Sequence, residues 1–414
     1  MDAGLELLLT AAGQALLDEL AELEPTPTNE LAVARRLRAR YPADLVTAAL
    51  GMHELRGRAQ VKFTRADQMY LTRDGLEQAS GEALARHRAR RYVAAGRVAD
   101  LCTGIGGDLI GLAGASGVAE VVAVDRDPLH LRMALLNVVA YQVGAGVIPE
   151  CVDVRDADLT GVDAAFVDPA RRAAGRRLPT GDSEPPLAWC DALTERVASV
   201  GVKAAPGLDR AAVPPGWEVE FVAVGRELKE AVLWSPALAS VATRATLLPP
   251  GRSTSAESGA STEPGGHEVS GGHEVSGGHE LLPSPGAPVV CGPPGEYLLD
   301  PNPAVTRAGL VEDLARMLGA WKIDPMIAFL SSDRPLNSPF GRALRVLDSR
   351  PWREKELAAR LRALGVGSVD IRRRGLAGDV DALRRKLRLP PGRPATLVMT
   401  RVADQPWALI CADA

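Results

Sequence analysis

Residues Val98–Ala113 read VADLCTGIGGDLIGLA, and this stretch decides the fold. A short apolar run ends at Asp100, a glycine-rich turn follows, and a helical pattern begins at Asp108. About twenty residues later a second apolar run ends in Asp125. This order predicts a nucleotide-binding βαβ unit, with a strand, a glycine-rich turn, a helix and an acidic residue at the end of the next strand.

The same alternation of strand and helix patterns continues to about residue 248 and predicts a mostly parallel, doubly wound α/β sheet. The expected strands are 98–101, 121–125, 147–152, 164–167, 200–204 and 218–224. The expected helices are 108–115, 128–143 and 187–199. The close pair 218–224 and 228–234 predicts an antiparallel hairpin at the edge of the sheet.

At 414 residues the chain is too long for one compact core, so we expect several units. In chain order they are a helical domain at 1–62, the α/β domain at 63–248, a flexible Pro/Gly/Ser-rich linker at 249–294, a short unit at 295–335 and a small α/β module at 336–414. In the short unit a helix is expected over 304–318. The linker repeats GGHEVS, with His267, His273 and His279. A metal-binding tail is one interpretation, but no helix supports the histidines, which favours a flexible linker.

Composition narrows the class of protein. The net charge is −4, so no global field attracts nucleic acid or membranes, although residues 341–401 carry 16 Lys+Arg against 6 Asp+Glu. Five cysteines are scattered without a CxxC pair, which argues against zinc and disulfides and fits a reducing, cytoplasmic setting. No apolar run approaches the length of a membrane span, and the start of the chain is a poor signal peptide.

The glycine-rich turn indicates which nucleotide is bound. Gly104, Gly106 and Gly107 allow close approach of a ligand, and their GxGG order differs from the GxGxxG of dinucleotide binders. Asp108 at the helix start is expected to repel a pyrophosphate. S-adenosylmethionine (SAM) carries no phosphate, so the turn favours SAM.

If SAM binds in this turn, the acidic residues that follow the strands can each contact one part of it. Asp100 is expected under the amino-acid moiety, with the backbone of Cys102, Thr103 and the three glycines lining it. Asp125 can accept both ribose hydroxyls. Asp153, one of three nearby acids with Asp156 and Asp158, can accept the adenine amino group.

The fourth strand ends in Asp168-Pro169-Ala170-Arg171, where the substrate of an open α/β sheet reacts. Asp168, Pro169 and Arg171 are therefore the catalytic candidates: Pro169 stiffens the turn, Asp168 can accept from a substrate amine, and Arg171 can contact a phosphate. No nucleophile is expected, because methyl transfer from a sulfonium releases a neutral leaving group. The segment 61–97 is expected either to contact cofactor or substrate or to end in a solvated, arginine-rich helix.

DLCTGIGGDLIGLA, AVDRDP, Asn137 within LLNVVAY, and FVDPARR resemble class I SAM-dependent methyltransferases. The turn is also similar to that of trimethylguanosine synthases. MYLTRDGLEQAS, ARHRARRY, VKAAPGLD, GRELKEAVLW, EYLLDPNPAVTRAG and the C-terminal DALRRKLRL resemble bacterial THUMP-like-domain methyltransferases. This resemblance implies a Rossmann-like methyltransferase domain at 63–248, a small ferredoxin-like or linker unit at 295–335 and a THUMP-like domain at 336–414.

The resemblance implies RNA as a partner, because THUMP domains in RNA-modifying enzymes bind RNA ends. The basic residues that could track phosphates are Arg372, Arg373, Arg374, Arg384, Arg385 and Lys386; a solvated face is the alternative. One departure stands out: amine-methylating relatives carry Asp/Asn-Pro-Pro-aromatic where this chain has Asp168-Pro169-Ala170-Arg171. The missing aromatic residue puts N-methylation of a base in doubt.

We therefore expect a SAM-dependent methyltransferase acting on a structured RNA such as tRNA or rRNA, without a metal. A methyltransferase of small molecules or proteins, and a non-catalytic RNA-binding protein that retains the SAM-binding fold, are the alternatives. A dehydrogenase is disfavoured by Asp108 and by the hairpin. No feature of the sequence indicates an oligomeric state.

Overall fold

The computed structural model describes residues 3–26, 28–170, 183–250 and 277–414, and the backbone alone at 172–173, 176–177 and 273–275. The chain divides into two compact units. The first contains Met1–Trp217 and Val232–Ser240, and the second contains Glu218–Ala231, Val241–Pro249 and Thr262–Ala414. Much of the expected linker, with His267, lies outside the described residues. Within the described residues, no helix has the length and apolar character needed to cross a membrane.

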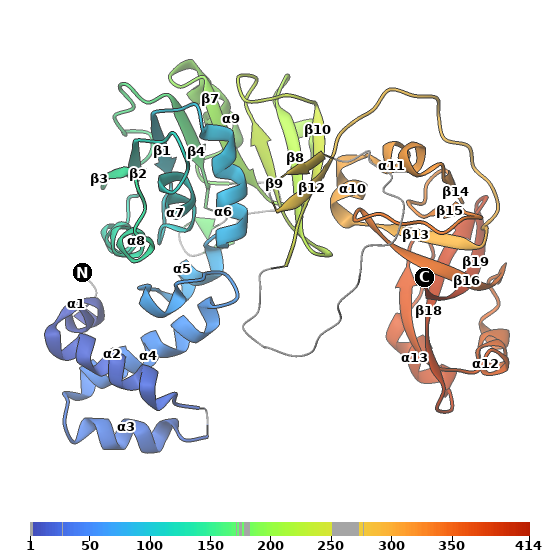
Figure 1. The fold of residues 1–414 in the computed structure, drawn as a ribbon, viewed down its shortest axis with the longest axis horizontal. Coiled ribbons are helices and arrows are strands. Elements are labelled where there is room, and N and C mark those ends of the chain that lie inside the picture. Colours follow the sequence, from blue (N-terminus) through green and yellow to red (C-terminus); the bar gives the residue numbers. More distant parts are fainter. Residues whose placement is uncertain are drawn as a thin grey trace. The chain divides into compact units, whose positions relative to one another are not determined.

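Helices begin the first unit, where the sequence predicts a helical domain at 1–62 (Figure 1). They are α1 (Ala3–Leu9), α2 (Ala11–Leu23), α3 (Glu30–Arg38) and α4 (Ala43–Ala59). The side chain of Thr10 caps α2 by accepting from the Gly13 N–H. Leucines spaced at helical intervals, such as Leu16 and Leu20, are fully buried and hold the bundle together.

Short helices connect this bundle to the sheet. They are α5 (Arg73–Gln78), α6 (Glu82–Ala89) and the 3₁₀ turn Arg90–Tyr92. Within the segment 61–97, α6 therefore tightens into a 3₁₀ turn at its end.

The sheet of the first unit has five parallel strands in the order β3-β2-β1-β4-β7. Their bounds are β1 Arg97–Leu101, β2 Glu120–Val124, β3 Gly146–Glu150, β4 Ala164–Val167 and β7 Ser199–Ala204. The helices are α7 (Gly107–Ala113), α8 (Pro128–Tyr141) and α9 (Leu187–Ala192). The strand order reverses between β1 and β4, so their carboxyl ends form the crevice in which such sheets bind ligands.

The expected helix over 187–199 is shorter than predicted. It ends at Ala192 and continues only as the 3₁₀ turn Leu193–Glu195. The two-stranded ribbon of β5 (Arg172–Ala173) and β6 (Arg176–Arg177) precedes it.

The second unit begins with β8 (Glu218–Val224), and β9 (Glu227–Trp234) lies next to it in the sheet, as the sequence predicts for this pair, although two residues join them rather than the expected three. The expected position of this hairpin at the sheet edge is wrong. The strand β10 (Thr243–Leu248) pairs in parallel with β8, and β12 (Gly278–Leu281) pairs with β10. Beyond β12 lies β11 (His273–Val275). Residues 278–281, expected as linker, are therefore a strand, because their register with β10 supplies backbone hydrogen bonds.

A seven-stranded sheet in the order β14-β15-β13-β16-β19-β18-β17 forms the C-terminal module. The strand bounds are β13 Tyr297–Pro301, β14 Trp321–Lys322, β15 Leu330–Ser332, β16 Gly341–Pro351, β17 Val366–Arg373, β18 Arg393–Val402 and β19 Gln405–Asp413. Because β13 pairs with β16, the short unit expected at 295–335 shares its sheet with the last seventy or so residues.

The helices of this region are α10 (Pro303–Ala308), α11 (Val311–Leu318), α12 (Glu354–Ala363) and α13 (Val380–Leu387), of which α10 packs against β8 and β10. The single helix predicted over 304–318 is two, because Gly309 ends α10 with a φ of 75°.

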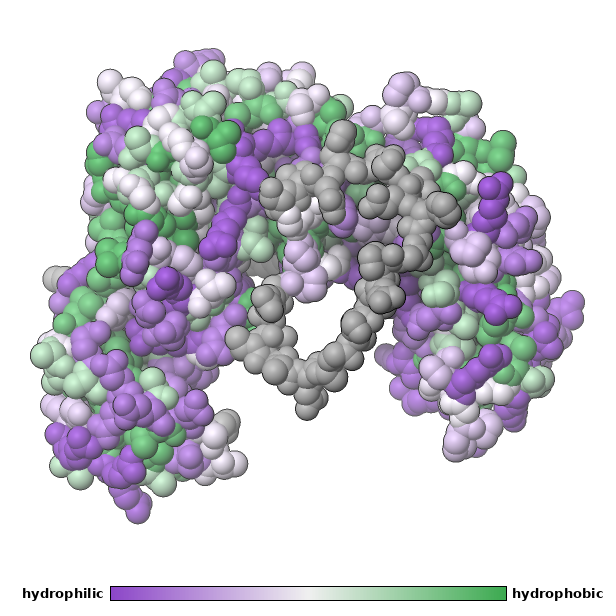
Figure 2. Space-filling view, in the orientation of Figure 1, coloured by the Kyte–Doolittle hydropathy of each residue, from purple (hydrophilic) through white to green (hydrophobic). Residues whose placement is uncertain are grey.

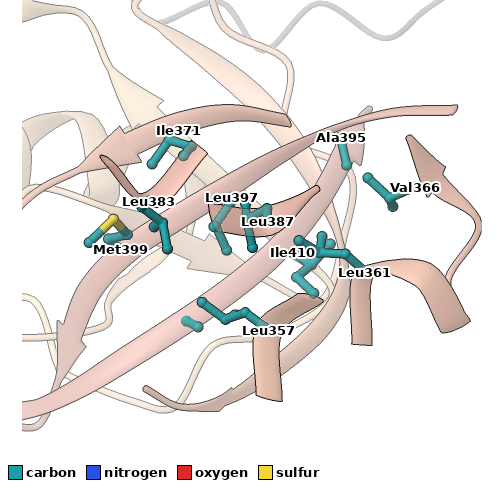
Figure 3. Packing of buried hydrophobic residues seen from close by; sticks show 11 residues of the cluster. Leu357, Leu361, Val366, Ile371, Leu383, Leu387, Ala395, Leu397, Met399 and Ile410 are labelled. Atoms are coloured by element: carbon teal, nitrogen blue, oxygen red, sulfur yellow. The ribbon is translucent and has the colours of Figure 1, made fainter. Parts of the chain in front are cut away.

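Both faces of the C-terminal sheet carry apolar cores. Figure 3 shows the cluster between the sheet and helices α12 and α13. Its members include Leu357, Leu361, Leu383, Leu387, Leu397, Met399 and Ile410. Each buried leucine side chain stabilises the fold by about 1.5–3 kcal/mol. Val398 and Leu409, adjacent to residues of the first cluster, belong to a second cluster with Phe329 on the other face.

Candidate cofactor and acceptor site

The glycine-rich turn folds the chain back tightly at the end of β1. The N–H groups of Cys102 and Thr103 both donate to the Val124 carbonyl, at 3.0 Å each. Cys102, Gly104 and Gly106 have positive φ values of 67°, 56° and 88°. The turn is thereby tied to β2 by its backbone rather than by side chains.

The glycines of the turn differ in the space that surrounds them. A Cβ at Gly106 would lie 3.0 Å from the Cα of Ala134 on α8, and one at Gly107 would lie 2.9 Å from the Ser80 carbonyl. A side chain at either position would therefore collide with the protein itself. At Gly104 a Cβ would meet nothing within 4 Å, so this residue borders open space.

Asp125 is fixed at the carboxyl end of β2. One of its oxygens accepts the Gly104 N–H at 2.7 Å and the other accepts the Asp127 N–H at 2.9 Å. Each carboxylate oxygen keeps a further lone pair. The acid is therefore held at the turn and can still accept two hydrogen bonds from a ligand.

Asp100 is fully buried, and neither carboxyl oxygen has a hydrogen-bond partner among the described residues. Burial raises the pKa of Asp100 well above its usual range, and the carboxylates of Asp108, Asp168 and Asp125 add to this increase. A buried carboxyl without a partner is costly unless a ligand supplies a donor or a cation.

Asp108 is paired, which the sequence did not indicate. Its carboxylate accepts from Nε of Arg88 on α6 at 3.0 Å, and both side chains are buried. The guanidinium also lies over the Phe166 ring, 5.0 Å from its centroid. The expected repulsion of a pyrophosphate by Asp108 is therefore wrong, because Arg88 compensates the charge. Because this pair is buried, Arg88 is not one of the solvated arginines considered for the helix in the segment 61–97.

Asn137 on α8 holds the segment before β1 against the turn. Its Oδ1 accepts the Tyr70 N–H at 2.7 Å, and its Nδ2 donates to the carbonyls of Tyr70 at 3.0 Å and Ile105 at 2.9 Å. The sequence showed Asn137 only as part of a family motif. Its buried amide explains why the backbone near Tyr70 lies beside the turn.

The acceptor side of the crevice contains a partly buried ion pair. Lys203, at the end of β7, donates to Oδ2 of Asp168 at 2.6 Å and to Oγ of Ser80 at 2.9 Å. Burial raises the pKa of Asp168, while the Lys203 ammonium acts in the opposite direction. Lys203 was missed by the sequence analysis, although the parallel pairing of β4 with β7 brings it beside Asp168.

The other candidates near this end of the sheet are placed as follows. Pro169 is buried, and Arg171 lies outside the described residues. Asp153 accepts the Arg155 N–H at 3.0 Å, and this bond lowers its pKa. Burial and the nearby carboxylates raise the pKa of the Cys102 thiol well above its usual range.

Comparisons with known proteins bear on this site. The chain is 36% identical to uncharacterized S-adenosylmethionine-dependent methyltransferases from two strains of Mycobacterium tuberculosis, over 350 residues that make up 81% of this chain and 85% of each relative. It is an S-adenosylmethionine-dependent methyltransferase.

Other comparisons agree with the architecture of this methyltransferase. The crystal structure of a candidate methyltransferase from Porphyromonas gingivalis W83 has the same fold, with a TM-score of 0.70 and 20% identity over 94% of this chain and 99% of that one. Residues 341–413 match the THUMP domain-like family, as the C-terminal resemblance predicted. Residues 3–59 match a domain of unknown function.

The first unit of the methyltransferase fits its cofactor. Asp100 offers a buried, unpartnered carboxyl, Gly104 borders open space, and Asp125 presents two spare lone pairs. The carboxyl of Asp100 can pair with the α-ammonium group of the cofactor, and the space at Gly104 allows the cofactor to approach the backbone closely. The lone pairs of Asp125 can accept hydrogen bonds from the two ribose hydroxyls.

In the THUMP-like region, the expected basic residues do not form one face. Ile371 of β17 packs in the cluster shared with α13, and Arg373 lies on the same face because strand side chains alternate. Arg372 lies on the opposite face. Arg374, just beyond the strand, packs over the Phe329 ring of the second cluster at 5.3 Å.

Two of these arginines pair with acidic residues on or near their own sheet. Arg374 pairs with the buried carboxylate of Asp300 at 2.9 Å, and Arg372 pairs with Asp370 at 3.0 Å. Arg374 in particular is a structural residue, because removing it would leave Asp300 short of a buried partner.

Helix α13 presents the more accessible basic residues. Arg384, Arg385 and Lys386 are exposed, since Leu383 and Leu387 bury the opposite side of the helix. Hydrophilic residues cover much of the surface around α12 and α13 (Figure 2). The exposed pairs that Arg384 and Lys386 form are worth little and can be exchanged for other anions.

Proposed function

We propose that this methyltransferase modifies RNA and that its THUMP-like region contributes to RNA binding. The observation that carries the proposal is the basic, exposed side of α13 within the residues that match the THUMP domain-like family. Arg373, on the same face of the sheet, extends it. Cations that are exposed and only weakly paired can neutralise phosphates at little cost.

The residues of the first unit have the following proposed roles. Asp100 binds the amino-acid part of the cofactor, the backbone of 102–107 lines it, Asp125 holds the ribose and Asp153 accepts the adenine amino group. When bound, the cofactor supplies an electrophilic methyl group. Asp168 and Pro169 position the acceptor, and the Asn137 amide keeps residues near Tyr70 over the turn so that water is excluded.

Transfer of labelled methyl groups to total RNA tests the substrate. RNA from a strain lacking the gene should accept more label than RNA from the parent strain, since the parental sites are already filled. Equal labelling of the two RNAs at background level would contradict the proposal, and label in protein or small molecules would replace it.

Charge reversal tests the binding surface. Arg385→Glu should weaken RNA binding and flatten its dependence on salt, because a phosphate contact is lost. Arg35→Glu, an equally exposed change on α3, is the matched control and should leave both unchanged. Identical binding curves for the two variants would remove α13 from the proposed interface.

A further inference from the structure

The pair formed by Asp168 and Lys203 is built by two neighbouring strands. Val167 of β4 pairs with Val202 of β7, so the next residue on each strand emerges at the same point of the sheet. The lysine side chain is 10% exposed and that of the aspartate is 23% exposed. Ser80, from the segment that lies against the glycine-rich turn, accepts a second hydrogen bond from the ammonium.

This arrangement leaves one carboxylate oxygen available. Oδ2 of Asp168 accepts from Lys203, whereas Oδ1 has no hydrogen-bond partner among the described residues. The lysine and the serine therefore fix the position of the carboxylate without occupying both of its oxygens. An acceptor group that carries a proton can donate it to Oδ1.

We propose that Lys203 and Ser80 hold Asp168 as the proton acceptor for a hydroxyl group, so that the methylated atom is an oxygen. Within the RNA function proposed above, on which this step rests, that hydroxyl is the ribose 2′-OH. Asp168 is then a catalytic residue, and Lys203 is a positioning residue that acts through it.

The chemistry of the transfer distinguishes oxygen from nitrogen. A hydroxyl group is a weak nucleophile and must lose its proton as it reacts. The acceptor oxygen forms a bond to the methyl carbon while the carbon–sulfur bond breaks, the electron pair of that bond stays on sulfur, and the hydroxyl proton passes to Oδ1 of Asp168. The neutral thioether and the protonated carboxyl complete the balance.

A nitrogen acceptor fits the pair less well. A ring nitrogen with a free lone pair has no proton to give to Asp168. An exocyclic amine becomes positively charged as it is methylated, and the Lys203 ammonium, bonded to the same carboxylate, opposes that charge.

Two neighbouring features agree with an oxygen acceptor. Pro169 and Ala170, which follow Asp168, offer no aromatic ring on which a base could stack. Burial strengthens Asp168 as a proton acceptor by raising its pKa, and Lys203 opposes that rise, which favours the ionised form.

The bond that holds the methyl group in the product distinguishes an oxygen acceptor from a nitrogen acceptor. The full chain is incubated with tritium-labelled methyl donor and extract from a strain lacking the gene, and RNA, protein and small molecules are separated. Hydriodic acid under mild heating releases volatile methyl iodide from O-methyl groups and leaves N-methyl groups intact. Volatile label in any of the three fractions supports an oxygen acceptor. If that label lies in protein or small molecules, the RNA proposal fails while the oxygen acceptor stands. Non-volatile label, or no label from a preparation that binds cofactor, overturns the oxygen acceptor.

Variants of Lys203 test the positioning role. Lys203→Met should lower kcat by roughly 100-fold while cofactor affinity stays within about twofold, because proton transfer rather than binding is impaired. The acidic limb of the kcat profile should move to higher pH, since loss of the ammonium raises the pKa of Asp168. Lys203→Arg should recover part of both.

Lys229→Met is the matched control, because Lys229 forms an ion pair of the same 2.6 Å length with Glu227 at an exposed site. It should leave kcat and its pH profile unchanged. If Lys203→Met does not fold, Ser80→Ala removes one contact of the lysine and should give a smaller change in the same direction. Wild-type kcat and pH profile in a folded Lys203→Met protein would overturn the role.

Discussion

Breaking the ion pair between Arg88 and Asp108 should strongly destabilise the first unit. Arg88 is 1% exposed and Asp108 is 7% exposed at their side chains, so neither charge has much access to water. Arg88→Met leaves the buried carboxylate of Asp108 without this cation, and Asp108→Asn removes this anion from the buried guanidinium. Because the pair joins α6 to the start of α7, its loss also loosens the turn that precedes α7.

The magnitude follows from this burial. Removing one partner of a buried pair costs about 3–5 kcal/mol, because the remaining charge is left uncompensated. That is a large part of a typical domain stability of about 5–15 kcal/mol. For a unit of this size, each kcal/mol lowers Tm by about 2–4 °C, so we expect a decrease of roughly 6–20 °C.

Urea denaturation and thermal unfolding of the full chain measure this effect. The double variant Arg88→Met/Asp108→Leu should recover most of the loss, since a neutral pair of similar volume has no charge to desolvate. Arg40→Met is the control: Arg40 pairs with Glu19 at 2.7 Å but is 57% exposed, and its removal should cost less than about 1 kcal/mol. Single variants at Arg88 and Asp108 that are no less stable than Arg40→Met, or a double variant as unstable as both singles combined, would refute the reasoning.

Three further predictions concern the cofactor crevice. Asp125→Ala should weaken cofactor binding by roughly 10- to 100-fold in calorimetry, as hydrogen bonds to a charged group are worth about 1.5–3 kcal/mol; unchanged affinity would contradict the ribose contact. Asp100→Asn should abolish tight cofactor binding yet raise the Tm of the cofactor-free protein at neutral pH. The pKa of Asp100 is higher in the folded state than in the unfolded state, so this carboxyl destabilises the fold more and more as the pH rises above the unfolded pKa. The stability advantage of the variant should therefore shrink toward pH 4, and an advantage that does not depend on pH would count against this reasoning. Gly106→Ala should destabilise the protein by about 1–3 kcal/mol in urea unfolding, because the residue has a φ of 88° and its Cβ would press on Ala134; a neutral effect would show that α8 yields.

The strands of the crevice could be predicted well because they are short, continuous apolar runs. Residues 164–167 form β4 with the predicted bounds, and β1 and β2 differ by one residue at their ends. The long strand β16 was not expected, because its apolar and polar residues do not alternate regularly and its pairing partners, β13 and β19, are distant in the sequence. The position of the hairpin was wrong because β10 and β12 are short segments that only pairing reveals as strands.

The sequence by itself determined the glycine-rich turn, the acids that follow the strands and the family of the protein, because each is a local pattern of adjacent residues. Only the tertiary structure decided which charges meet. Arg88 reaches Asp108 across a helix pair, Lys203 reaches Asp168 across two parallel strands, and Arg374 turns inward to Asp300. The physical reason is that an ion pair depends on distance and burial, and sheet register and helix packing set both for residues far apart in the chain.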